Sequence, residues 1–204
     1  MNQKHQEDLS HIRSMMERSS RFISLSGLSG VFAGLSALIG GLYICLLLEQ
    51  NGMKCYGIET YSFSNVLILQ LIQVGAMIFV FALGFGILFT VRKSKKNDLP
   101  IWTSSTKNML INLAIPLLVG GVFCLGLLYH QVFELVAPTT LVFYGLALVN
   151  AEKYTFSDIK YLGYCEIILG CFSLFYVGYG LVFWILGFGV LHILYGLIMF
   201  KKYK

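Results

Sequence analysis

Two residues combine acid–base chemistry with an apolar setting: Glu166 and His192. Each lies inside a long hydrophobic run, where an ionised carboxylate is costly unless it is paired, protonated or hydrated. We therefore expect Glu166 to have a partner. His192 is the only histidine well inside such a run. Because imidazole titrates near neutral pH, the pair could relay protons, bind a cation or hold a polar substrate.

The spacing of the pair is compatible with direct contact. If the turn between the last two apolar runs centres on Tyr179, Glu166 lies 13 residues before it and His192 lies 13 residues after it. Antiparallel helices would hold both at one depth, but helix rotation decides whether they face each other, and the sequence does not fix it. The alternative is a structural role, as a neutral hydrogen bond between helices or as a glutamate that reaches back to the membrane surface.

Other polar residues within the apolar runs extend the candidate site for a substrate or ion: Gln70, Gln73, Asn112 and Tyr144, the last preceded by Thr139 and Thr140. Individually, each is more often a hydrogen-bonding contact between helices than a ligand group. The chain has no CxxC, HExxH or Gly-x-Ser-x-Gly motif, so we predict no catalytic residue, no metal site and no cofactor. An enzyme would have to work with Glu166 and His192 almost alone, and we favour a non-enzymatic role.

The elements that must position these residues are membrane helices. The 204 residues are 57% hydrophobic and 12% charged, whereas a soluble domain is about 25% charged. A helix needs roughly 20 apolar residues to cross the hydrocarbon core. We identify six candidate runs, at 22–48, 61–91, 108–129, 132–149, 161–177 and 181–200. The predicted fold is an all-α bundle of six transmembrane helices over 22–204, behind a cytoplasmic amphipathic segment over 1–21.

The basic residues predict the orientation. With the N-terminus inside, all but one of the 15 Lys and Arg residues lie in inner segments, and only Lys54 lies outside. We therefore place both termini in the cytoplasm and expect the lipid bilayer to be the main partner. The net charge of +5 is divided among short segments and is not gathered on one face, which argues against a nucleic-acid partner. The fourth run is short and contains Pro138, so we expect a kink or partial break near its outer end.

Glycine-containing segments recur along the chain. A helical hairpin used three times would produce such a pattern, with Gly120 equivalent to Gly170 and Gly145 equivalent to Gly196. Chance matching between Gly-rich apolar segments is the alternative. The segments are Leu38-Ile-Gly-Gly-Leu-Tyr43, Leu118-Val-Gly-Gly-Val-Phe123 and Ile168-Leu-Gly-Cys-Phe172 in the odd runs, and Phe85-Gly-Ile87, Tyr144-Gly-Leu146 and Tyr195-Gly-Leu197 in the even runs.

Two further patterns each leave two interpretations open. Ser26, Gly30 and Gly34 form a stripe of small residues, which would pack against another helix of the chain or form a homo-oligomer contact. Cys45 and Cys55 both approach the outer surface, where they would form a disulfide or remain free thiols.

The segment Arg18-Ser-Ser-Arg-Phe-Ile-Ser-Leu-Ser-Gly-Leu-Ser-Gly-Val-Phe-Ala-Gly34 resembles the start of uncharacterised bacterial multi-pass inner-membrane proteins. This resemblance implies the cell inner membrane and no particular activity. The function we predict is a small transporter or channel-like protein with a polar site between the fifth and sixth helices. The alternative is a non-transporting membrane sensor or scaffold that binds a cytoplasmic partner or anionic lipid. A water-accessible cavity reaching Glu166 would favour transport, and a dry bundle would favour the scaffold.

Overall fold

A computed structural model describes residues 26–57, 63–98 and 100–203. The regular elements among these residues are all helices, with no strand. The α-helices are α2 (Gly27–Gln50), α3 (Asn65–Lys96), α4 (Ser104–Tyr129), α5 (Val136–Ala151), α6 (Ile159–Phe175), α7 (Gly180–Trp184) and α8 (His192–Lys202). Two 3-10 turns, η1 (Phe133–Leu135) and η2 (Glu152–Tyr154), flank α5, and a π-helical segment, η3 (Ile185–Leu191), joins α7 to α8. The amphipathic segment expected over 1–21 lies outside the described residues.

Five helical stretches are long and apolar enough to cross a membrane, and they correspond to five of the six expected runs: Gly27–Gln50, Asn65–Lys96, Ser104–Tyr129, Phe133–Tyr154 and Gly180–Lys202. The remaining run forms α6, which has 17 residues. At 1.5 Å per residue α6 is about 25 Å long, slightly less than the ~30 Å hydrocarbon core. The architecture is that of an all-helical, multi-pass membrane protein.

Local sequence explains where several helices begin. The Ser64 side chain accepts a hydrogen bond from the backbone N–H of Leu67 at the start of α3, and Thr103 and Thr106 form a capping box at the start of α4. The break expected near Pro138 is the 3-10 turn η1 before α5. Pro138 itself lies in the first turn of α5, where its missing N–H removes no intrahelical hydrogen bond.

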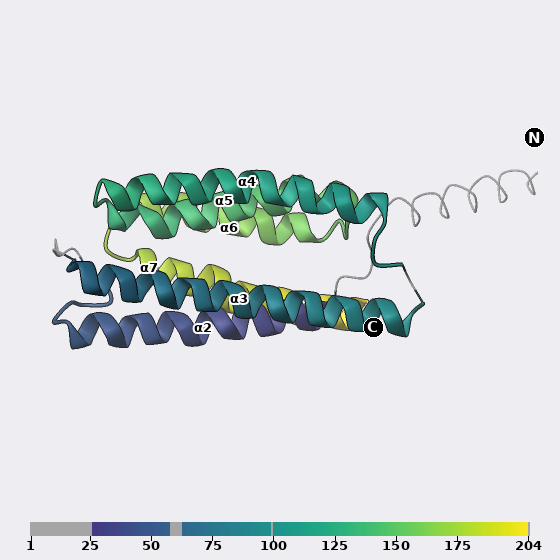
Figure 1. Cartoon of the computed structure of the whole chain (residues 1–204), viewed down its shortest axis with the longest axis horizontal. Coiled ribbons are helices and arrows are strands. Elements are labelled where there is room, and N and C mark those ends of the chain that lie inside the picture. The colour runs from purple at the N-terminus through teal and green to yellow at the C-terminus, as the bar shows by residue number, and fades with distance from the viewer. Residues whose placement is uncertain (1–25, 58–62, 99, 204) are drawn as a thin grey trace, which may run out of the picture.

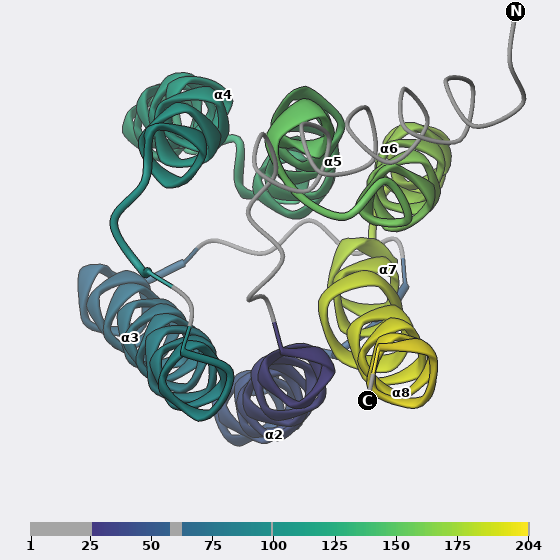
Figure 2. The ribbon, with the colours of Figure 1, turned by 90° about the vertical axis from the view of Figure 1, so that its right-hand side faces the viewer.

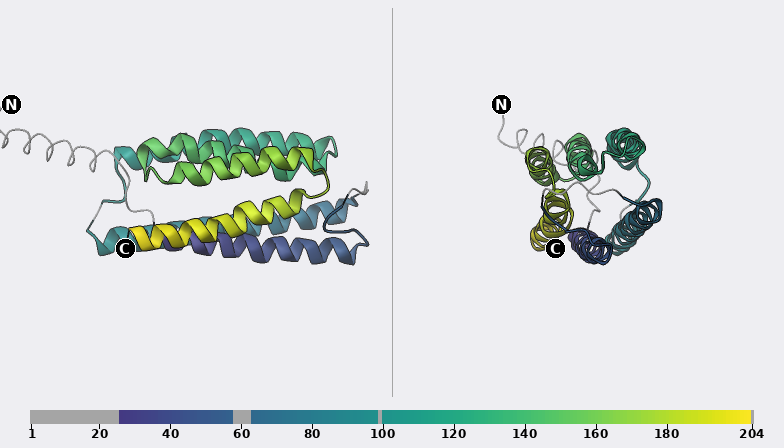
Figure 3. Two further views of the ribbon diagram at one scale, coloured as in Figure 1. Left: turned by 180° about the vertical axis from the view of Figure 1, so that it is seen from behind. Right: turned by 90° about the vertical axis from the view of Figure 1, so that its left-hand side faces the viewer.

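The helices form two layers. Figure 1 shows α4, α5 and α6 in one layer, and α2, α3 and the α7–α8 segment in the other. Viewed along the helices in Figure 2, these elements surround a common centre, and Figure 3 shows the two layers from behind. Within the layers, α5 packs against both α4 and α6, and α2 packs against both α3 and α8. The layers meet where α7 and η3 contact α5 and α6.

The closest helix packing occurs at two glycine crossings. Where α5 crosses α6, a Cβ atom added to Gly145 would lie 2.6 Å from the carbonyl oxygen of Gly163. Where α8 crosses α2, a Cβ atom added to Gly196 would lie 2.7 Å from the carbonyl oxygen of Gly27. No side chain fits at these distances. Each pair is therefore packed backbone to backbone, as small residues allow in membranes.

Each crossing has a second glycine further along the helix. A Cβ atom on Gly170 of α6 would lie 3.0 Å from the backbone nitrogen of Val142 of α5, and one on Gly34 of α2 would lie 2.9 Å from that of Ile193 of α8. The stripe containing Gly34 thus packs against α8 of the same chain. Of the two interpretations of this stripe, this is the packing of helices within one chain. A homo-oligomer contact through these glycines would compete with α8.

The two ends of the bundle differ in chemistry. One end carries basic residues, with Lys93, Lys95 and Lys96 in the last turn of α3 and Lys201 and Lys202 in the last turn of α8. Figure 1 shows this end of α3 beside the C-terminus. There the Lys93 ammonium group donates a hydrogen bond to the backbone oxygen of Tyr203 at 3.3 Å.

Asp158 joins the C-terminal segment to the start of α6. Its carboxylate accepts hydrogen bonds from the Lys202 ammonium group at 2.7 Å and from the Tyr203 hydroxyl at 2.8 Å. The hydrogen bond from Lys202 lowers the pKa of Asp158 below its usual value.

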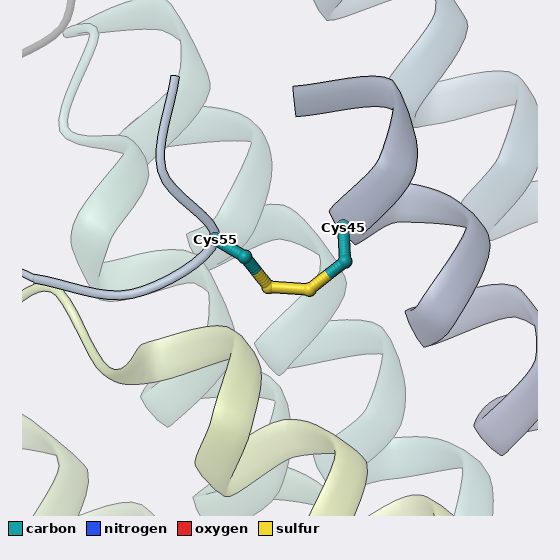
Figure 4. Close-up of a disulfide and its surroundings, with 2 residues drawn as sticks. All are labelled: Cys45 and Cys55. Atoms are coloured by element: carbon teal, nitrogen blue, oxygen red, sulfur yellow. A yellow bond between two sulfur atoms is a disulfide. The ribbon is translucent and has the colours of Figure 1, made fainter. Parts of the chain in front are cut away.

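The opposite end carries a disulfide. Cys45 in α2 is bonded to Cys55 in the segment after that helix, with their Cα atoms 5.0 Å apart (Figure 4). Of the two alternatives that the sequence left open for these cysteines, the structure contains the disulfide. Such a bond persists in an oxidising compartment.

The glycine crossings predict opposite effects for two similar substitutions. Gly145→Ala should lower the thermal stability of the detergent-solubilised protein, since an added methyl group overlaps the α6 backbone and overpacking costs about 1–3 kcal/mol. Gly121→Ala on α4 is the matched control, because a Cβ atom there meets no neighbour and alanine favours the helix by about 1 kcal/mol. Equal stability of the two variants would contradict the backbone-to-backbone packing of α5 and α6.

Candidate functional site

Glu166, His192 and Tyr144 meet where the two layers join. Glu166 lies in α6, Tyr144 in α5 and His192 at the start of α8. The Nδ1 atom of His192 lies 3.3 Å from Oε1 of Glu166, and its Nε2 atom lies 2.8 Å from the Tyr144 hydroxyl. The predicted proximity of Glu166 and His192 is confirmed. Tyr144, one of several polar residues in the candidate set, completes what we call the Tyr–His–Glu cluster.

The π-helical segment sets the protonation pattern of His192. The Nδ1 atom lies 3.0 Å from the backbone oxygen of Gly187 within η3. A carbonyl oxygen can only accept, so Nδ1 carries a proton and donates it to Gly187. In the neutral ring Nε2 is then an acceptor, and the Tyr144 hydroxyl donates to it. A second proton on His192 would turn Nε2 into a donor and reverse this last hydrogen bond.

Glu166 is completely enclosed. Its exposed fraction is 0%, and neither carboxyl oxygen has a hydrogen-bond partner among the described residues. A Cβ atom on Gly187 would lie 2.5 Å from Oε2, so the absence of a side chain there leaves space for the carboxyl group. His192, with Nδ1 3.3 Å from Oε1, is the basic side chain placed to pair with this carboxyl group. With one proton between them, the pair is either two neutral groups or an ion pair, and both states are compatible with burial.

Aromatic rings separate the cluster from the disulfide end of the bundle. Trp184, Phe188 and His192 follow one another at intervals of four residues, with ring centroids 5.0 and 5.7 Å apart. The Phe188 ring also lies 5.0 Å from that of Tyr144. These rings place apolar surface between the polar atoms of the cluster and that end.

The remaining residues of the predicted site lie elsewhere. Gln70 and Gln73 are exposed on α3. The Asn112 side chain donates to the backbone oxygen of Asn108, and the backbone oxygen of Asn112 accepts from Asn150, which links α4 to α5. Thr140 donates to the backbone oxygen of Ala137, while Thr139 is buried in α5. None of the hydrogen bonds described for residues 26–57, 63–98 and 100–203 joins these side chains to the cluster.

The sequence interpretation missed the contribution of η3. Gly187 supplies both a carbonyl acceptor for His192 and space for Glu166. The available signal was the Gly187-Phe-Gly189 segment directly before the buried histidine, because closely spaced glycines weaken a helix. An apolar groove follows α4 between Leu118 and Val132, and no residue of the cluster lines it.

No protein-family model, curated protein or solved structure matches the chain. Its function therefore has to be argued from the site itself.

Proposed function

We propose that the chain is a small proton-coupled membrane transporter, in which the Tyr–His–Glu cluster links the two helix layers under the control of protonation. The observation that carries this proposal is the position of His192. From one layer, its imidazole contacts Tyr144 and Glu166 of the other, at 2.8 and 3.3 Å. Ionisable residues inside a membrane are costly, and they mark ion pathways and proton relays in pumps and transporters.

Each member of the cluster is next to a glycine crossing. Tyr144 directly precedes Gly145, and Glu166 directly precedes Ile167, whose backbone nitrogen would lie 2.9 Å from a Cβ atom on Gly145. These two residues therefore move with the α5–α6 pair. His192 precedes Ile193 and moves with the α2–α8 pair. Rotation of one pair against the other stretches the contacts of His192, which supports transport by rocking of rigid bodies.

Protonation controls the strength of this link. With one shared proton, Glu166 and His192 attract each other as an ion pair or coexist as neutral groups. A second proton leaves an imidazolium next to a neutral carboxyl, and loss of the shared proton leaves a buried carboxylate next to neutral imidazole. Two unit charges 4 Å apart interact by about 4 kcal/mol at an effective dielectric constant of 20. An energy of that size shifts a two-state equilibrium by roughly a thousandfold.

The segment η3 supplies a break in the helix beside the cluster. It has seven residues, including Gly187 and Gly189, and lies between α7 and α8. π-Helical turns occur frequently at functional sites, and transporters place substrate and ion sites at discontinuous helices. We assign η3 as the hinge about which α7 moves relative to α8.

We further propose that α6 is a sixth span and that both termini are cytoplasmic. Since α6 packs against α5 and is about 25 Å long, modest thinning of the bilayer would accommodate it. The basic ends of α3 and α8 belong on the inside by the positive-inside rule. The Cys45–Cys55 disulfide belongs on the oxidising side. Both features are compatible with the bacterial inner membrane that the resemblance of the N-terminal segment implies, with the disulfide in the periplasm.

The two glycine crossings also support the repeated hairpin. The contacts of Gly145 and Val142 with α6 resemble those of Gly196 and Ile193 with α2, which favours the equivalence of Gly145 and Gly196. In this comparison Gly34 of α2 corresponds to Gly170 of α6. The sequence pattern aligns Gly40 with Gly170, so the alignment of the first copy changes by six residues. A third crossing, between α3 and α4, is not made at the equivalent Gly86, where an added Cβ atom meets open space.

The second candidate function is the membrane sensor or scaffold. The full burial of Glu166 favours it, because a scaffold needs no route for water to reach the carboxyl group. In the transporter, the same burial corresponds to a closed conformation. The two functions differ in whether protonation of Glu166 is coupled to movement of an ion across the bilayer.

The orientation predicts the location of fused reporters. Reporters placed after Lys4, within Ser94–Asp98 and after Lys204 should lie in the cytoplasm, and one near Lys54 should lie outside. The reason is that all but one of the basic residues lie on the same side of the membrane as the first three sites. Alkaline phosphatase and green fluorescent protein fusions measure the two locations. A periplasmic C-terminus would contradict the six-span topology.

The function predicts a specific effect of Glu166→Gln. The amide preserves size and hydrogen bonding but cannot titrate, so the variant should fold and lose proton flux driven by a pH gradient. Flux is measured with pyranine enclosed in proteoliposomes whose membrane potential is clamped by potassium and valinomycin. The matched control is Glu49→Gln, at the exposed end of α2, which should retain the flux. Equal flux in wild type and the Glu166 variant would contradict the transporter proposal and favour the scaffold.

A further inference from the structure

We propose that Tyr195 relays protons between the Tyr–His–Glu cluster and Asp158 at the basic end of the bundle. This inference rests on the proposed function and adds a route by which the enclosed cluster exchanges protons with one side of the membrane. The route consists of three proton-carrying groups: the surface carboxylate of Asp158, the buried hydroxyl of Tyr195, and the hydroxyl of Tyr144 in the cluster.

Helix geometry places Tyr195 between the two ends of this route. His192 and Tyr195 are three residues apart on one side of α8, so Tyr195 lies about 4.5 Å nearer the basic end. Asp158 directly precedes α6, eight residues before Glu166, which corresponds to about 12 Å along the helix in the same direction. Tyr195 is therefore at a depth between the cluster and Asp158.

The hydroxyl of Tyr195 is buried and has no hydrogen-bond partner among the described residues. Its side chain packs against the buried apolar cluster of Leu148, Ile159 and Leu162. Buried hydroxyl groups without a partner are rare in native proteins, and each calls for an explanation such as a bound water or a catalytic role. A hydroxyl group with free donor and acceptor positions is what a proton relay requires.

The titratable groups around Tyr195 lie on both sides of it. Asp158 and Tyr203 are close enough to interact electrostatically with Tyr195 from the basic end. Tyr144 interacts with Tyr195 and with Glu166 from the other direction. Around Asp158 itself, Lys202 and Lys160 contribute positive charge.

The transfer is balanced in protons and charge. Asp158 takes a proton from surface water and passes it to the oxygen of Tyr195, which releases its own proton to Tyr144. Tyr144 in turn releases its proton to Nε2 of His192, and the imidazolium gives its Nδ1 proton to Oε1 of Glu166, which lies 3.3 Å away. A single bridging water on each side of Tyr195 would complete the chain of hydrogen bonds. The net result is one proton gained by the Glu166–His192 pair and one lost by water, with Asp158, Tyr195 and Tyr144 unchanged.

Aromatic rings cover the cluster on the side that faces the disulfide end, opposite Tyr195. Phe188 stacks on His192 and packs against Tyr144, and Trp184 packs on Phe188. Neither Phe188 nor Trp184 carries a group that exchanges protons in the physiological range. The arrangement therefore favours proton exchange through Tyr195.

The experiment measures how fast Glu166 becomes protonated. After a pH jump, time-resolved infrared spectroscopy of the full chain in liposomes follows the carboxyl band of Glu166, which is assigned by its loss in Glu166→Gln. Tyr195→Phe keeps the ring and removes the relay oxygen, so protonation should slow by about tenfold or more. Tyr164→Phe, on the exposed side of α6, is the matched control and should leave the rate unchanged.

The outcomes separate this route from the proposed function. An unchanged rate in Tyr195→Phe would overturn the relay while leaving a titrating Glu166 and the transporter proposal intact. If no Glu166 band titrates in the wild-type chain, both the proposed function and the route are wrong. Asp158→Asn provides a second variant that does not alter the buried tyrosine, and it should also slow protonation without changing the final extent. A changed extent with an unchanged rate would contradict the relay.

Discussion

A carboxyl group inside the hydrocarbon region must be neutralised, and this requirement at Glu166 governs how the two layers fit together. The carboxyl group has no exposure, and the one basic side chain close to it among the described residues is the imidazole of His192. Gly187 leaves space for the carboxyl group and accepts the Nδ1 proton of that imidazole. The π-helical segment thus satisfies two requirements with one residue. Removing His192 would leave the buried carboxyl group of Glu166 without its partner.

The glycine crossings determine which helices move together when the contacts of the cluster change. Backbone-to-backbone packing joins α5 to α6 and α2 to α8, each without intervening side chains. Between these two tight pairs, the layers are joined at α7 and η3, and the cluster contributes ionisable contacts there. Interfaces of this kind have discrete arrangements, because packed side chains do not deform continuously. A change in protonation at the cluster therefore changes the relative stability of two arrangements of the layers.

Sequence reasoning found what depends on hydrophobicity and spacing. Apolar runs predicted the positions of the helices, and equal distances from Tyr179 predicted that Glu166 and His192 share one depth. What depends on helix rotation could not be predicted. The sequence did not indicate that α8 packs against α2, that Tyr144 contacts His192, or that η3 is π-helical, since many rotations of apolar helices bury similar areas. The bounds of α6 were also shifted by two residues: the run was expected at 161–177, whereas the helix is Ile159–Phe175. Tyr176 and Val177 are apolar enough to extend a run but lie beyond the end of the helix.

The central claim is that protonation of the cluster moves one layer against the other, and electron–electron double resonance distances measure this directly. Spin labels at positions 49 and 130 report the disulfide end, and labels at 95 and 153 report the basic end, after Cys124, Cys165 and Cys171 are replaced by serine. We predict that lowering the pH changes the two distances in opposite directions, and that Glu166→Gln abolishes both changes. Distances that stay constant at both ends, while Glu166 gains and loses its proton, would contradict the account.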